Sequence, residues 1–293
     1  MNKTHPVFSP MIQGYWRMAE WGMNTQQQLS FVKQHLELGI TTVDHAPVYG
    51  PDSACERMFG QVLALDSSLR DQIEIVSKCG IYRGEDPQVN HYNSGKAAII
   101  ESVDQSLTRL NTDHLDVLLL HRPDLLMDAD EAAEAFAQLK AAGKVKHFGV
   151  SNFTPAQFAL LQSRVEQPLI TNQVEINPVN LQMTEDGTLD QLQQHRVQPM
   201  AWSCLAGGRI FSEESEQMDR IRHTLTQVAQ EIGASSIDQV IFAWVLRLPS
   251  NPIPILGSGN IERVHAAVGA LELSLTNEQW YRIWVASKGH GVA

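Results

Sequence analysis

Strand-like and helix-like segments alternate along this chain of 293 residues, and this alternation restricts the possible folds more than any other feature. Segments with apolar residues at helical spacing, such as 26–38 and 96–110, separate most of the predicted strands. Strands that alternate with helices pair in parallel, so eight of them predict a (β/α)8 TIM barrel forming a single domain over residues 1–293. An open doubly wound sheet is the alternative. The predicted strands lie at 12–16, 41–44, 74–78, 117–121, 147–152, 172–177, 200–203 and 253–256.

Polar residues end three of these predicted strands. Asp44 closes the second strand, and Tyr49 follows five positions later in a loop. Lys78 ends the third strand and His121 ends the fourth. In a barrel of parallel strands the carboxyl ends converge on one face, where active sites are built. We therefore expect a carboxylate, a phenol, an ammonium and an imidazole to share one site.

Each of these residues has a structural interpretation when it is taken alone. Asp44 is compatible with a helix cap or a loop, and His121 with a hydrogen-bonded core histidine. Lys78 is harder to explain in this way, because the strand before it is apolar on both faces. A lysine that ends such a strand is expected to be partly buried and to need a partner, and Asp44 is the nearest carboxylate.

Together, the four residues suit the reduction of a carbonyl group. Hydride addition leaves an alkoxide, so a positioned acid must donate a proton to the oxygen. A cation about 4 Å from Tyr49 would lower the phenol pKa by up to roughly three units before desolvation opposes it. Lys78 would supply this cation, Asp44 would keep it charged, and neutral His121 would donate a hydrogen bond to the substrate oxygen. This chemistry needs no metal.

Asp44, Tyr49, Lys78 and His121 resemble the catalytic tetrad of the aldo-keto reductases, in the same order and strand context. The resemblance is greatest to short bacterial members and extends over essentially the whole chain. It implies a TIM barrel that reduces aldehydes and ketones to alcohols with NADPH. The similarity continues at Gly14-Tyr15-Trp16, at Glu56 and Gly60, at 106–116 and at 143–153.

The same resemblance implies the residues that bind NADPH. Polar amides at strand ends would hold the nicotinamide carboxamide, and an aromatic ring would stack on the nicotinamide: Ser151, Asn152, Gln173 and Trp202. One loop would close over the pyrophosphate: Ser203, Leu205, Gly207, Gly208 and Arg209. A second loop would bind the 2′-phosphate: Gly257, Ser258, Gly259, Asn260 and Arg263. Aromatic and apolar residues are expected at the cofactor or around the substrate pocket: Tyr15, Trp16, Trp21, Met23, Tyr82 and Tyr92.

The chain departs from the family pattern in the second of these loops. Gly257 stands where many members carry a lysine, and Ala266-Ala267 stands where the family usually has Glu-Asn. The 2′-phosphate would then depend on Arg263 and on backbone amides at a helix start. We therefore expect a preference for NADPH over NADH that is smaller than in members with both cations.

Charge and composition limit the partners and the compartment. The net charge is −11 without any Lys/Arg block, which disfavours nucleic acid and anionic membranes as partners. The sequence contains neither an apolar run of roughly 20 residues nor an apolar signal-peptide core near residues 1–6. Cys55, Cys79 and Cys204 form no CxxC pair, which argues against a zinc site and for reduced thiols. We expect a cytoplasmic protein that is a monomer or a weak dimer.

Two other classes of function remain open. One is a regulatory subunit that senses the cofactor and retains only residual reductase activity, since some relatives with this tetrad regulate ion channels. The other is a metal-dependent barrel hydrolase that uses Asp44, His45 and His121. The absence of an HxH pair and of paired carboxylates at strand ends counts against the hydrolase.

Overall fold

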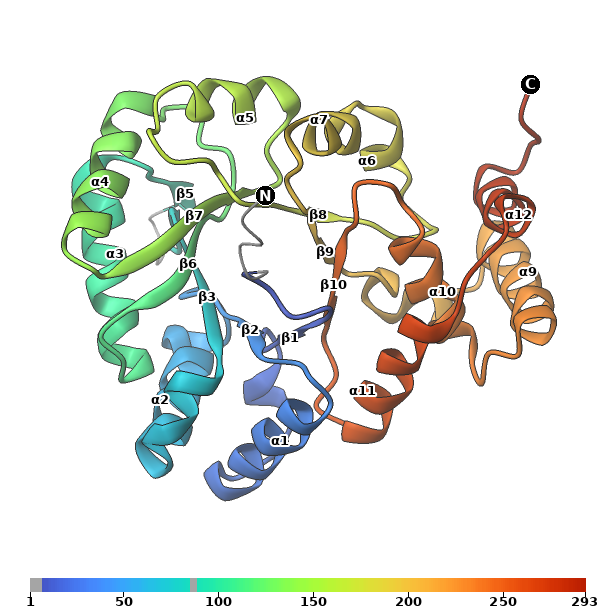
Figure 1. Ribbon diagram of the computed structural model, residues 1–293, viewed down its shortest axis with the longest axis horizontal. Coiled ribbons are helices and arrows are strands. Elements are labelled where there is room, and N and C mark those ends of the chain that lie inside the picture. The colour runs from blue at the N-terminus through green and yellow to red at the C-terminus, as the bar shows by residue number, and fades with distance from the viewer. Residues whose placement is uncertain (1–6, 85–88) are drawn as a thin grey trace, which may run out of the picture. The chain divides into compact units, whose positions relative to one another are not determined.

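The computed structural model describes residues 7–84 and 89–293 (Figure 1). Residues 1–6, where no signal peptide is expected, and residues 85–88, inside the loop predicted at 80–95, lie outside this description. Eight parallel strands form a closed barrel in the order β1-β10-β9-β8-β7-β6-β3-β2. This confirms the predicted (β/α)8 class over the open sheet. The chain divides into two compact units, 1–173 and 174–293, which are described separately, and the single domain stays a prediction.

The first unit contains the strands that end in the predicted tetrad. β2 pairs in parallel with β3, and β3 pairs with β6, so their carboxyl ends lie at the same edge of the sheet. In these ladders Asp44 lies opposite Val76, and Lys78 lies opposite Leu119. The strands are β1 (Ile12–Gly14), β2 (Thr42–Asp44), β3 (Glu74–Cys79), β6 (Leu115–Leu120) and β7 (Val145–Ser151), while β8 (Asn172–Glu175) crosses the division between the units.

Helices follow the strands of this unit, and in Figure 1 α2, α3 and α4 succeed one another along the outside of β3, β6 and β7. Several helices begin at the residues that capping chemistry predicts. Asn24 and Thr154 each form a capping box, in which the side chain accepts a hydrogen bond from the third helical amide. The helices are α1 (Thr25–Glu37), α2 (Ala54–Leu65), α3 (Lys96–Leu110), α4 (Ala129–Ala141) and α5 (Pro155–Gln162), with 3-10 turns at Met18–Glu20, Pro51–Ser53 and Ser67–Gln72.

A glycine brings α2 and α3 together at their backbones. A Cβ atom placed on Gly60 would lie 2.0 Å from the carbonyl oxygen of Arg109, closer than any real contact allows. Any side chain at position 60 would therefore push the two helices apart.

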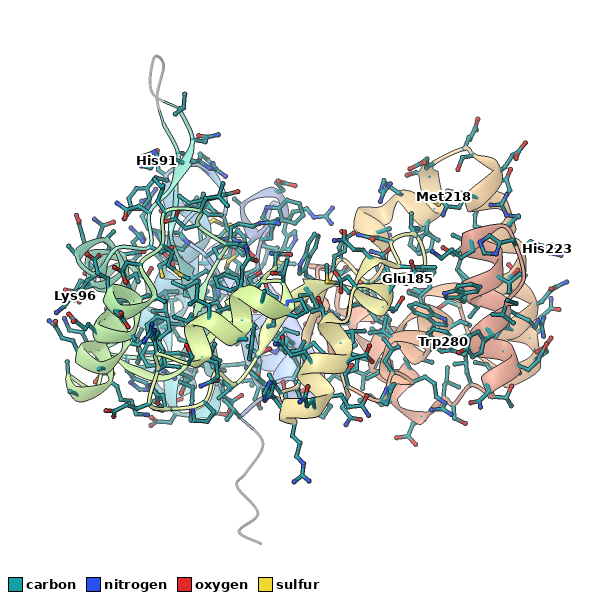
Figure 2. The ribbon with its side chains drawn as sticks, turned by 90° about the horizontal axis from the view of Figure 1, so that it is seen from above. His91, Lys96, Glu185, Met218, His223 and Trp280 are labelled. Atoms are coloured by element: carbon teal, nitrogen blue, oxygen red, sulfur yellow. The ribbon has the colours of Figure 1, made fainter. Side chains whose placement is uncertain are left out.

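The loop after β3 contains a small antiparallel hairpin that the sequence did not predict. β4 (Ile81–Tyr82) pairs with β5 (His91–Tyr92), and the rings of Tyr82 and His91 stack with centroids 5.4 Å apart. His91 is labelled on this hairpin in Figure 2. Two-residue strands are too short to produce a periodic pattern, so this part of the loop could not be distinguished from irregular structure.

The second unit supplies two strands, β9 (Met200–Trp202) and β10 (Ile253–Leu256), and the long helices that follow them. α7 was not predicted, because in its polar sequence only Leu189 and Leu192 provide buried apolar side chains. The helices are α6 (Gln182–Glu185), α7 (Thr188–His195), α8 (Arg209–Ser212), α9 (Glu216–Ile232), α10 (Ile237–Leu246), α11 (Ile261–Val268) and α12 (Asn277–Lys288), with 3-10 turns at Ala206–Gly208 and Gly269–Glu272.

Two tryptophans connect α10 to α12. The rings of Trp244 and Trp280 stack at 4.8 Å with an interplanar angle of 7°, and Trp280 is labelled in Figure 2. Each indole N–H donates to the other residue's backbone carbonyl, at 3.2 and 3.1 Å. Within 7–84 and 89–293, no helix is both long and apolar enough to cross a membrane.

Candidate active site

Lys78 lies at the centre of a buried polar cluster in the first unit. Its side chain is 0% exposed, and its ammonium contacts Asp44 Oδ1 at 2.7 Å and Oδ2 at 2.8 Å. It also donates to the His45 carbonyl at 2.8 Å and to Tyr49 Oη at 2.9 Å. The predicted burial of Lys78 and its pairing with Asp44 are therefore confirmed. Four oxygens around one ammonium compensate for the water that burial removes.

Tyr49 and His121 complete the cluster. The Tyr49 hydroxyl lies 3.5 Å from Asp44 Oδ2, and the ammonium of Lys78 lies 4.8 Å from the centre of the Tyr49 ring. The rings of Tyr49 and His121 meet edge to face, with centroids 5.9 Å apart. The four predicted residues are thus brought together from the ends of β2, β3 and β6.

The electrostatics of Tyr49 correct one sequence-based expectation. Burial raises the pKa of Tyr49 well above its ordinary value of 10.0, and the charge of Asp44 and its hydrogen bond to the phenol raise the pKa further. The Arg122 guanidinium opposes this rise. The predicted lowering of the phenol pKa by a cation allowed for opposition by desolvation, and the net shift is upward because desolvation and Asp44 outweigh the cationic effect. At neutral pH the phenol therefore keeps its proton, as a proton donor must.

The pKa values of the two bases in the cluster, Lys78 and His121, are lowered, which favours their neutral forms. Burial lowers the pKa of Lys78 from 10.5, while the charge of Asp44, its hydrogen bond and the charge of Glu56 act in the opposite direction. Burial also lowers the pKa of His121 well below 6.5, and the charges of Lys78 and Arg122 add to this effect. His121 is therefore neutral at physiological pH, as expected.

Two arginines beside the cluster were not predicted. Arg122 directly follows His121 and is close enough for its charge to act on both Tyr49 and His121. Arg83, next to the β4–β5 hairpin, donates to the backbone carbonyls of Val48 and Gly50, on either side of Tyr49. The position of Arg122 was visible in the sequence, whereas the contact of Arg83 depends on the hairpin.

The predicted nicotinamide residues of the first unit lie at the ends of β7 and β8. Ser151 Oγ donates to the Gln173 carbonyl at 2.9 Å, and Asn152 Nδ2 donates to Ser151 Oγ at 2.8 Å. The side chain of Gln173 reaches the tetrad, since its Nε2 donates to Asp44 Oδ1 at 2.8 Å. These contacts place amide groups next to the tetrad, and their predicted roles at a cofactor stay predictions.

Tyr15 belongs to the core instead of to the predicted cofactor contacts or pocket wall. It is 1% exposed, its hydroxyl lies 2.9 Å from His35 Nε2, and its ring stacks on His45 at 4.8 Å. His35 Nδ1 lies 2.7 Å from the Ile40 carbonyl, so this nitrogen carries the proton and Nε2 accepts from Tyr15. Trp16, by contrast, is 60% exposed.

His45 is a fully buried histidine whose ring nitrogens have no hydrogen-bond partner among the described residues. Its ring lies between Tyr15, at 4.8 Å, and Phe59, at 4.5 Å. Burial lowers the pKa of His45 from 6.5 to about 3, and the charge of Lys78 adds to the shift. The folded protein therefore holds this ring neutral through most of the acidic range.

His45 is expected to make the protein sensitive to acid. Because its pKa is lower in the folded state, its contribution to stability is complete above pH 6.5 and is lost as pH falls toward 3. From pH 6.5 to about pH 4.5 this one group should cost roughly 2–3 kcal/mol of unfolding free energy. His45→Phe should show a shallower decline in urea unfolding over this range, whereas His223→Gln, at an exposed position, should follow the wild type. Parallel curves for wild type and His45→Phe would refute the expectation.

The predicted pyrophosphate loop lies in the second unit, directly after β9. Ala206, Gly207 and Gly208 have φ angles of 51°, 68° and 95°. No atom lies within 4 Å of a Cβ built on Gly208, while the Gly208 amide donates to the Leu205 carbonyl at 2.9 Å. Successive amides in left-handed or turn conformations form concavities that bind anions. Arg209 is exposed and lies 3.5 Å from Glu213.

The predicted 2′-phosphate loop follows β10 in the same unit. Asn260 caps α11 by accepting from the amide of Glu262 at 2.9 Å, and its own amide donates to Ser258 Oγ at 3.1 Å. These contacts use two of the amides that an anion could otherwise bind. Arg263 is exposed, and its side chain makes no hydrogen bond or ion pair with the residues that the structure describes.

The geometry gives no support to the metal-hydrolase hypothesis. Asp44 is engaged by Lys78, and the ring of His45 lies between Tyr15 and Phe59. Across 7–84 and 89–293, no three His, Cys, Asp or Glu residues are arranged to hold a metal ion.

Comparisons with known proteins agree with the fold and with the family that the sequence resembles. A sequence model of the Aldo/keto reductase family matches residues 10–287. Oxidoreductase YdhF of Escherichia coli (strain K12) is 57% identical, over 98% of this chain and 96% of that protein. A 6-dehydroglucose reductase of Agrobacterium fabrum is 39% identical, over 97% of this chain and 96% of that protein. The crystal structure of the thermostable aldo-keto reductase Tm1743 with the inhibitor epalrestat matches with a TM-score of 0.80 and 25% identity, covering 94% of both chains.

Proposed function

Since this chain belongs to the aldo/keto reductase family, we propose that it reduces aldehydes or ketones to alcohols with NADPH, with Tyr49 as the general acid. The observation that carries the proposal is the buried cluster in which the Lys78 ammonium contacts Asp44 at 2.7 Å and Tyr49 at 2.9 Å. It supports a protonated phenol oriented by a cation, which is the arrangement that carbonyl reduction requires.

In the proposed mechanism the tetrad residues have separate tasks. His121, neutral because burial lowers its pKa, donates a hydrogen bond to the carbonyl oxygen of the substrate and orients it. When bound, a nicotinamide cofactor supplies the hydride. Tyr49 then donates its proton to the oxygen on which negative charge develops, and Lys78 stabilises the phenolate that is left. Asp44, supported by Gln173, keeps the ammonium in place.

The residues of both units have the chemistry that a nicotinamide dinucleotide needs. In the first unit, Ser151 and Asn152 carry hydroxyl and amide groups suited to a carboxamide. In the second unit, the turn at Gly207 and Gly208 would leave room for a diphosphate, and Arg263 would offer its exposed guanidinium to a further phosphate. Trp202 at the end of β9 is proposed to cover the nicotinamide ring.

NADPH oxidation with a panel of carbonyl compounds tests this function. The panel should include aromatic aldehydes, small ketones and keto sugars, because relatives 39% and 34% identical to this chain are named 6-dehydroglucose reductases. Carbonyl-dependent loss of NADPH absorbance with formation of the alcohol is the expected result. Turnover slower than cofactor exchange with every compound would favour the regulatory subunit instead.

Arg263 should determine how strongly the protein prefers NADPH. Guanidinium pairs with a phosphate in a bidentate way, and NADH lacks the 2′-phosphate. Arg263→Ala should therefore weaken NADPH binding by roughly 1.5–3 kcal/mol and leave NADH binding almost unchanged. Dissociation constants from fluorescence titration provide the measurement, with Arg196→Ala as an exposed control in the same unit. Equal weakening of both cofactors would mean that Arg263 supports the fold.

A further inference from the structure

Glu56 on α2 is a buried carboxylate to which the mechanism above gives no role. Its side chain is 0% exposed. Oε1 accepts a hydrogen bond from Ser77 Oγ at 2.7 Å, and Oε2 accepts from Arg109 Nε, also at 2.7 Å. A buried carboxylate is costly unless it is paired and hydrogen-bonded, and both oxygens of Glu56 meet this condition.

The partner of Glu56 on β3 is the residue immediately before Lys78. Side chains alternate between the two faces of a strand, so Ser77 and Lys78 point in opposite directions. The contacts agree with this alternation, because Ser77 meets Glu56 on the helix side while Lys78 meets Asp44 on the other. The end of β3 therefore lies between two carboxylates, of which only Asp44 touches the ammonium.

We propose that Glu56 is a positioning residue whose negative charge, together with that of Asp44, keeps Lys78 as an ammonium beside Tyr49. The proposal rests on the proposed function, in which Lys78 stabilises the phenolate of Tyr49. Burial lowers the pKa of Lys78, and the charge of Glu56 opposes this shift together with the charge and hydrogen bond of Asp44.

Several other charged or titratable groups surround Lys78, and all of them except Arg109 stay unchanged in the test. Asp44 and the neutral ring of His45 come from β2 and the loop after it, and Tyr49 comes from the same loop. His121 and Arg122 follow β6, and Arg109 on α3 acts through its pair with Glu56. Each of the variants Glu56→Gln and Arg109→Gln therefore removes one charge near Lys78 and leaves the other charges in place.

Glu56→Gln keeps the shape of the side chain and removes its charge. With less negative charge near Lys78, the ammonium loses its proton at a lower pH. The alkaline limb of the kcat/KM profile for NADPH-dependent reduction should therefore move to lower pH by about half a unit or more. Arg109→Gln leaves the charge of Glu56 uncompensated and should move the same limb to higher pH. If the pair had a purely structural role, the two variants would not shift the alkaline limb in opposite directions. An alkaline limb at the wild-type pH in both variants would overturn the proposal.

Two variants serve as controls. Asp116 is another buried carboxylate with an arginine partner, since it accepts from Arg70 at 2.7 Å and from the Ile75 amide at 2.9 Å. Asp116→Asn should lower thermal stability and leave the alkaline limb where it is. Glu56→Asp keeps the charge and should return the limb toward the wild-type position. If Glu56→Gln does not fold, the upward shift in Arg109→Gln remains the deciding measurement.

A spectroscopic titration separates this inference from the proposed function. NMR of protein labelled with 13C-tyrosine follows Tyr49 directly, with its resonance assigned by Tyr49→Phe. Loss of the Lys78 proton should shift the Tyr49 signal, and Glu56→Gln should lower the pH midpoint of this shift, whether or not the protein turns over. If the wild type is inactive and Glu56→Gln still shifts the midpoint, the proposed function is refuted and the role of Glu56 is supported. If the wild type is active but Glu56→Gln shifts neither the midpoint nor the alkaline limb, the role of Glu56 is refuted and the proposed function stands.

Discussion

Tyr49→Phe is expected to reduce the turnover of carbonyl compounds by a factor of roughly 10²–10⁴ and to leave NADPH affinity almost unchanged. The substitution removes only the hydroxyl, which lies 2.9 Å from the Lys78 ammonium and retains its proton because burial raises its pKa. The hydroxyl acts on the oxygen that becomes negative in the transition state, so its loss should appear in kcat and not in cofactor binding.

Steady-state kinetics and NADPH titration of the same preparation would check this result. Tyr281→Phe removes the hydroxyl of an exposed tyrosine in the second unit and should behave as the wild type. Retention of more than about a tenth of wild-type turnover, a loss under roughly 1.4 kcal/mol, would exclude Tyr49 as the acid.

Lys78→Met should reduce both activity and stability. The phenolate would lose the cation that stabilises it, so turnover should fall by a factor of about 100 or more. Asp44 would remain 3% exposed without its ion-pair partner, and breaking a buried pair typically costs about 3–5 kcal/mol. Urea unfolding and carbonyl reduction measure the two effects separately.

A double variant distinguishes these two effects. Asp44→Asn in the Lys78→Met background removes the stranded charge, so it should recover part of the lost stability without recovering turnover. Recovery of both would mean that Lys78 acts only by supporting the fold, which would contradict its proposed role.

The convergence of the tetrad could be predicted because it depends on topology. In a parallel barrel, residues at the ends of β2, β3 and β6 must lie at one edge, whatever the details of packing. The burial of Lys78 followed from the apolar residues before it. The pKa of Tyr49 could not be predicted in the same way, because it is the sum of desolvation and of several charge effects that act in opposite directions.

Other parts of the site depend on contacts between residues that are distant in sequence. Tyr15 lies in the Gly14-Tyr15-Trp16 motif, which suggests a cofactor contact, yet its hydroxyl forms a hydrogen bond with His35 on α1. Glu56 and Gly60 were recognised as part of a family pattern, but their common partner, Arg109, lies on α3, about fifty residues further along the chain. Single-sequence patterns report local periodicity and cannot supply such pairings.

The close packing of α2 against α3 also limits how this barrel can be redesigned. Three positions along this segment are held by other elements. Tyr49 contacts Lys78, Glu56 contacts Ser77 and Arg109, and Gly60 packs against the backbone of α3. An insertion between positions 49 and 60 would therefore disturb the tetrad. Loop grafts intended to change substrate range belong elsewhere. Leu125 and Leu126 in the turn after β6 are 92% and 91% exposed, so new residues can be introduced there if His121 and Arg122 at the start of the turn are kept.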